Sequence, residues 1–67
     1  MQIHVNGEVT TFNGKIIPDL LIARGFKPRQ SGLAVAVNGA VVSRSAWEQT
    51  LLNHGDKVEI VQIVRGG

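Results

Sequence analysis

The sequence contains no cysteine. This absence excludes disulfide bonds and thiolate metal sites within the chain, and it excludes mechanisms that use a cysteine nucleophile or a cysteine persulfide of its own. Small domains often depend on disulfides or bound metals, because they bury a smaller fraction of their surface than large domains do. Here the hydrophobic core must stabilise the fold by itself, and 6 isoleucine, 5 leucine and 9 valine residues supply the material.

Long apolar runs and a concentration of one charge are also absent. No run approaches the ~20 residues that span a bilayer, and Met1–Val5 enters an alternating pattern rather than a signal peptide. Seven Lys and Arg against five Asp and Glu give a net charge of +2, and the basic residues are scattered. Nucleic-acid-binding surfaces usually gather such residues. We therefore expect a cytoplasmic protein with no membrane and no nucleic-acid partner.

No Ser–His–Asp arrangement or pair of carboxylates stands out, and the five acidic residues are dispersed. A chain of 67 residues forms one domain, which we place at 1–67. Such a domain has little room for a closed pocket lined by catalytic groups. The composition therefore favours a carrier or binding module over an enzyme, and a monomer when free.

Strand signals occur in both halves of the chain. Polar and apolar residues alternate as in half-buried strands, and two Asn-Gly pairs, Asn6-Gly7 and Asn38-Gly39, stand between such segments. Asn-Gly is the strongest short-range signal for a two-residue hairpin turn, because both residues tolerate positive φ angles. The expected strands are 2–6, 8–12, 33–37, 40–43 and 57–64.

A helix is expected between the two hairpins. Pro18 suits its first turn, and Asp19 places a negative charge near the positive end of the helix dipole. Gly25 is expected to end the helix as a left-handed cap, with Phe26 folding back onto the last turn. The side of the helix that carries the apolar stripe contains Ile17, Leu20, Leu21 and Arg24.

The order of these elements predicts the fold. A hairpin, a helix, a strand pair, an irregular helical turn over 44–48 with Trp47 and a last strand follow one another, unlike the strict alternation of doubly wound folds. The pattern predicts an α+β β-grasp (ubiquitin-like) fold. We expect a mixed four- to five-stranded sheet, one main helix across one face, and a flexible Gly-Gly tail over 63–67.

The chain closes with Arg65, Gly66 and Gly67 directly after its most apolar strand. Glycine has no Cβ, so such an end can thread a narrow channel in a partner enzyme. A carboxylate at Gly67 is ionised at neutral pH and can attack the α-phosphate of ATP to form an acyl-adenylate. The plainer alternative is that two glycines fray at a terminus.

The alternation of the last strand places Val61 and Ile63 on the face opposite the one expected to meet the helix. Ala34 and Ala36 would widen this face into a flat patch, since they carry no bulky side chains. Exposed apolar groups beside a functional tail are typical of a docking surface. Alternatively, the segment around Trp47 covers these residues.

Other candidates have simpler explanations. His4 and His54 are expected to be surface residues, because a metal site needs three or four convergent ligands. Asp56 is expected to bond the backbone of its own turn. The basic and aromatic residues of 24–29 could contact RNA, but positive charge at a helix C-terminus explains them as well.

Three stretches resemble the ThiS family, the sulfur carriers of thiamine biosynthesis: Val37–Trp47, Gly55–Val61 and the closing Gly66-Gly67. The similarity extends over the whole chain, and the joint spacing of the stretches makes it specific. Ser43 stands where relatives often have proline, and Arg65 where many have a small residue. The second departure leaves a protein-conjugating role open, because ubiquitin-type modifiers also end in Arg-Gly-Gly.

The resemblance implies that a ThiF-like adenylyltransferase uses ATP to adenylate Gly67, with Gly66 and Arg65 in its channel. A cysteine desulfurase relay then supplies sulfur, and the resulting thiocarboxylate serves a ThiG-like thiazole synthase. No permanently bound cofactor and no metal are implied. Alternatives are the small subunit of molybdopterin synthase, a ubiquitin-like modifier and a small RNA-binding module.

Overall fold

The computed structural model describes residues 1–63; Arg65, Gly66 and Gly67 lie outside the described residues. Seven elements follow one another in this range. They are β1 (Gln2–Val5), β2 (Glu8–Thr11), α1 (Ile17–Ala23), β3 (Leu33–Val37), β4 (Ala40–Val42), the 3₁₀ helix η1 (Arg44–Gln49) and β5 (Lys57–Gln62).

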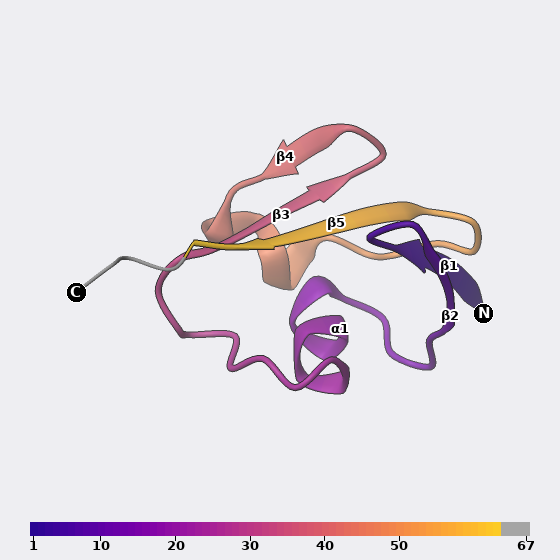
Figure 1. Ribbon diagram of the computed structural model, residues 1–67, viewed down its shortest axis with the longest axis horizontal. Coiled ribbons are helices and arrows are strands. Elements are labelled where there is room, and N and C mark those ends of the chain that lie inside the picture. The colour runs from indigo at the N-terminus through magenta and orange to yellow at the C-terminus, as the bar shows by residue number, and fades with distance from the viewer. Residues whose placement is uncertain (64–67) are drawn as a thin grey trace.

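The strands form one five-stranded sheet in the order β2-β1-β5-β3-β4. β5 pairs parallel with β1 and antiparallel with β3, and the two hairpins supply the outer strands. α1 lies against one side of the sheet (Figure 1). The predicted β-grasp architecture is confirmed, with five strands. No helix within residues 1–63 has the length and apolar character needed to cross a bilayer.

The core lies between α1 and the sheet. The buried stripe of α1 consists of Ile17, Leu20 and Leu21, as predicted, whereas Arg24 caps the helix and is exposed. The sheet residues that face the helix are almost completely buried: Ile3, Val5, Val35 and Val58. Each such side chain contributes roughly 1.5–3 kcal/mol when removed from water. This burial replaces the disulfides that the chain lacks.

Both ends of α1 carry the expected caps. At the C-terminus, Gly25 adopts a φ of 87° and its N–H donates to the Ile22 carbonyl, while the Phe26 N–H donates to the Leu21 carbonyl at 2.8 Å. This is a Schellman motif, and Phe26 packs against the core. At the N-terminus, Asp19 accepts hydrogen bonds from backbone N–H groups that precede the helix.

The segment after β4 forms η1, in agreement with the predicted irregular turn. Trp47 is 3% exposed, and its indole N–H donates to the Val42 carbonyl at 2.9 Å. It packs with the core on the helix side of the sheet. Leu52 then returns the chain to the core before β5 begins.

The Asn6-Gly7 and Asn38-Gly39 pairs form the predicted tight turns. Asn6 and Asn38 have φ angles of 50° and 52°, and the glycines that follow both have φ of 85°. Two consecutive residues with positive φ define a type I′ turn, whose twist matches that of the flanking strands.

The side chains of these asparagines also hold β5, a role that the sequence did not suggest. The Asn6 carboxamide accepts from the Ile60 N–H at 2.8 Å and donates to the Ile60 carbonyl at 3.3 Å. The Asn38 carboxamide accepts from the Lys57 N–H at 2.9 Å. Each asparagine side chain therefore bonds the backbone of β5 at the point where the strand that precedes the asparagine has ended in a turn.

Replacing Asn6 by alanine should lower the free energy of unfolding by about 1–3 kcal/mol, because two bonds to Ile60 are lost and alanine tolerates positive φ poorly. Urea denaturation followed by tryptophan fluorescence measures this change. Asn13→Ala is the matched control, since Asn13 also precedes a glycine but has no positive φ. Equal effects of the two substitutions would contradict the anchoring role.

Asp19 predicts a pH dependence of stability. Its Oδ2 accepts from the Lys15 N–H at 2.9 Å and the Ile16 N–H at 3.1 Å, and these bonds lower the pKa of Asp19 from its ordinary value of 3.8. A lowered pKa means that the folded state favours the ionised form. The contribution is therefore present above the ordinary value and is lost as the pH falls through the folded-state pKa.

The difference in unfolding free energy between the wild type and Asp19→Asn should accordingly be largest above about pH 5 and shrink below the ordinary aspartate pKa. Urea titrations at several pH values measure it. Glu8→Gln, which removes an exposed carboxylate, is the control. A difference that does not change with pH would show that the charge of Asp19 has no part in capping.

Candidate functional site

The open face of the sheet, opposite α1, is apolar at the end where β5 finishes. Val58 and Ile60 point into the core, while Val61 and Ile63 are 52% and 60% exposed. Trp47 packs on the helix side of the sheet and leaves both exposed. Of the two interpretations of the sequence, the exposed one is therefore correct, and the covered one is wrong.

Two small residues of β3 lie beside this pair. The register of the sheet sets Ala34 opposite Val61 and Ala36 opposite Glu59, and both alanines are half-buried. We call Ala34, Ala36, Val61 and Ile63 the open-face patch. Because the alanines add little height, the patch is flat and its two larger side chains are accessible to a partner.

Beside the patch, Gly32 fixes the position of Ile63. Ile63 lies one residue beyond β5, yet its N–H donates to the Gly32 carbonyl at 2.7 Å. Gly32 has a φ of +81°, and a Cβ at this position would lie 2.7 Å from the Ile63 carbonyl oxygen. Only glycine allows this approach. The sequence contained no local sign of this contact.

The predicted tail residues Arg65, Gly66 and Gly67 lie outside the described residues, as does Val64 at the end of the strand expected over 57–64. The structure therefore describes the platform from which that segment continues. It consists of the open-face patch and the hydrogen bond between Gly32 and Ile63.

The other candidates serve the fold. His54 Nδ1 accepts from the Gln2 N–H at 3.1 Å. Asp56 accepts from Asn38 Nδ2 and from the Asn53 N–H, so its predicted role as a turn residue is confirmed. Within residues 1–63, no group of three or more histidine, aspartate or glutamate side chains is placed to hold a metal ion.

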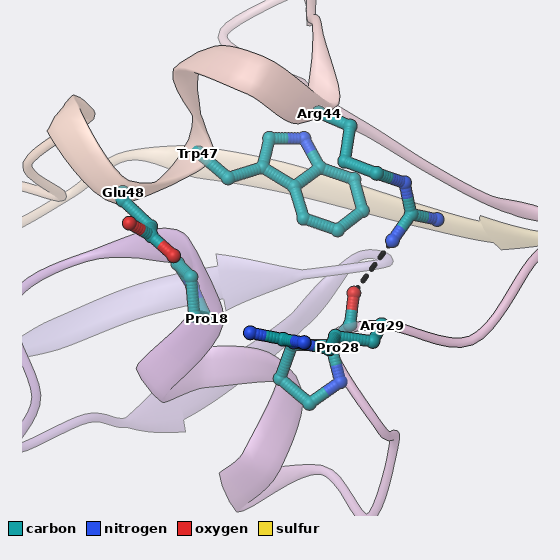
Figure 2. A pocket seen from close by; sticks show the side chains of 6 residues that line it. All are labelled: Pro18, Pro28, Arg29, Arg44, Trp47 and Glu48. Atoms are coloured by element: carbon teal, nitrogen blue, oxygen red, sulfur yellow. Dashed lines mark hydrogen bonds between the residues drawn. The ribbon is translucent and has the colours of Figure 1, made fainter.

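A hollow of about 160 Å³ opens on the helix side of the molecule (Figure 2). It lies between α1, the loop that follows α1, and η1. Its lining combines two arginines with apolar rings: Pro18, Pro28, Arg29, Arg44, Trp47 and Glu48. Arg44 reaches across to the loop and donates to the Pro28 carbonyl.

Comparison with known proteins identifies the family to which this chain belongs. The sequence model of the ThiS family matches residues 3–67. The chain belongs to the ThiS family. The sulfur carrier protein ThiS of Escherichia coli is 38% identical over 68 residues that cover both chains completely. The crystal structure of the thiamine biosynthesis protein ThiS from Geobacter metallireducens superposes with a TM-score of 0.81 at 31% identity, again over both whole chains.

Other relatives are longer proteins. Thiazole synthases of Magnetococcus marinus and Paramagnetospirillum magneticum are 38% and 34% identical to this chain, which spans about a fifth of their length. The resemblance noted in the sequence is thus confirmed as ThiS membership, and the β-grasp fold is that of a solved ThiS protein. The chain is a small sulfur carrier of this family.

Proposed function

We propose that this ThiS chain carries sulfur as a thiocarboxylate on Gly67 and delivers it for assembly of the thiazole ring of thiamine. The observation that carries the proposal is the match to a ThiS carrier along both whole chains. The fold supports it, because β5, the last described strand before the glycine pair in the sequence, carries exposed apolar side chains at its end.

The chemistry requires a partner with an ATP site, which we propose is a ThiF-like adenylyltransferase. The Gly67 carboxylate attacks the α-phosphate, pyrophosphate leaves, and the acyl-adenylate makes the carbonyl electrophilic. A persulfide from a cysteine desulfurase relay then displaces AMP, and reduction of the sulfur–sulfur bond by a thiol leaves the thiocarboxylate. The chain has no cysteine to hold transferable sulfur, and the proposal places that sulfur on the Gly67 carbonyl.

In this scheme the chain is a carrier and co-substrate, and the partners perform the catalysis. It binds no cofactor permanently, and ATP belongs to the adenylating partner. We propose a ThiG-like thiazole synthase as the acceptor of the sulfur. Two relatives named thiazole synthase contain a segment similar to this whole chain. This supports a functional association between the sulfur carrier and a thiazole synthase.

The open-face patch is the proposed docking surface for the adenylating partner. Val61 and Ile63 are more than half exposed, although they belong to the most apolar segment of the chain. Such residues are available for burial in an interface. The five residues from Ile63 through Gly67 can reach up to roughly 15–18 Å when extended. This length is enough for Arg65 and Gly66 to lie inside a channel of the partner.

Incubation with ATP, the adenylating enzyme, a desulfurase and cysteine should increase the intact mass by the difference between one sulfur and one oxygen. Fragmentation should place this change at Gly67, because the carboxylate is the group that is activated. A variant that lacks Gly67 is the control, and it should show no such modification at Gly66 if the sulfur is added specifically at Gly67. An isopeptide-linked ladder in place of the sulfur adduct would instead support a protein modifier.

Val61→Gln should raise the KM of adenylation about fivefold to tenfold, because loss of a hot-spot side chain at the centre of an interface costs more than about 1 kcal/mol. The stability of the fold should change little, since Val61 is half exposed. Ile22→Gln is the matched control, because Ile22 is 63% exposed and lies on α1, on the other side of the sheet from the patch. Equal KM values for the two variants would show that the partner docks elsewhere.

A further inference from the structure

The loop between α1 and β3 is tied to η1 by one side chain. Arg44, the first residue of η1, donates from Nη1 to the Pro28 carbonyl at 2.6 Å and from Nη2 to the Gln30 carbonyl at 2.7 Å. Figure 2 shows the guanidinium reaching from η1 across to the loop. Gln30 also bonds Lys27 through its side chain and its backbone. Those bonds shape the loop internally, whereas Arg44 joins it to the body of the protein.

Arg44 itself rests on a rigid support. Its guanidinium carbon lies 4.5 Å from the centre of the Trp47 ring, a distance at which a cation is attracted to the face of an indole. Trp47 is buried and bonded to Val42. The planar guanidinium can stack on the ring while two of its nitrogens donate to the two carbonyls, whereas the lysine ammonium lacks the flat face and the fixed fork of donors.

The far end of the same loop meets the end of β5. The loop runs to the end of the molecule where β3 begins and β5 finishes (Figure 1). There Gly32 accepts the hydrogen bond from the Ile63 N–H and leaves no space for a Cβ against the Ile63 carbonyl. Any displacement of Gly32 must therefore displace Ile63. A continuous series of contacts leads from Trp47 through Arg44 and the loop to the first residue of the tail.

We propose that Arg44 is a positioning residue that, through the loop, holds Ile63 at the end of β5, the point from which the chain continues. It acts through the loop, and within residues 1–63 its hydrogen bonds go to Pro28 and Gln30 and not to the open-face patch. This inference rests on the proposed function, in which the segment beyond Ile63 must enter a partner's channel. Misplacement of Ile63 would slow the reaction at Gly67 more than it weakens docking, because Val61 stays paired with Ala34 inside the sheet.

The first test uses amide hydrogen exchange of the free, isotope-labelled protein by NMR. Arg44→Lys should accelerate exchange of the Ile63 amide about tenfold, since local opening governs protection. The amides of Ile60 and Asn38 should keep their protection. Arg29→Lys is the matched control, because Arg29 is an exposed arginine that lines the same hollow. Unchanged exchange at Ile63 in Arg44→Lys would overturn the proposal.

The second test separates positioning from a merely structural role. With the adenylating partner, Arg44→Lys should lower kcat about fivefold or more and leave KM within about twofold, because orientation of a reacting group affects the chemical step. An unchanged kcat would overturn the proposal. If the wild type itself is not adenylated, the proposed function fails, while the exchange measurement still decides the role of Arg44.

Gly32→Ala tests the same series of contacts from its other end and leaves Arg44 in place. The added Cβ should displace the Ile63 carbonyl, so faster exchange of the Ile63 amide and a lower kcat are expected. This variant also decides the question should Arg44→Lys fail to fold. Normal exchange and normal kcat in Gly32→Ala would show that the loop does not direct the tail.

Discussion

The central position of β5 is the constraint on which the rest of the structure depends. β5 pairs with a strand on each side, and the amide side chains of Asn6 and Asn38 bond its backbone near Ile60 and at Lys57. A strand held in this way cannot slip by one residue, because a slip would turn its buried side chains toward solvent. The alternation of β5 therefore decides which face of the protein is core and which is available to a partner.

This arrangement lets a small domain combine stability with an accessible apolar surface. The helix-facing side of the sheet, including Val58, is buried against α1. On the opposite side Val61 and Ile63 are exposed at the end of β5, beside the small side chains of Ala34 and Ala36 and near Val41, which pairs with Ala36. A carrier needs no catalytic pocket of its own. It needs a platform that a partner can bind and from which a narrow segment can extend.

Hydrogen bonds from polar side chains to the backbone recur wherever regular structure ends. Asp19 binds the N–H groups before α1, Arg44 binds two carbonyls of the loop after α1, and the turn asparagines bind β5. Backbone polar groups require partners wherever they leave the ladder of a sheet or helix. In a chain with short elements these bonds determine how the loops sit, and hence where the end of β5 is held.

The sequence by itself determined the elements and the family. Alternation, the Asn-Gly turns, the Gly25 cap and the motif spacing of the ThiS family are all local patterns, and each was correct in the structure or the comparisons. It left open whether Val61 and Ile63 were covered, and it contained no sign of the bonds made by Asn6 or Arg44. Asn6 and Ile60 are 54 residues apart. Only tertiary packing brings such groups together, because a sequence pattern reflects the geometry of neighbouring residues and not the choice of distant partners.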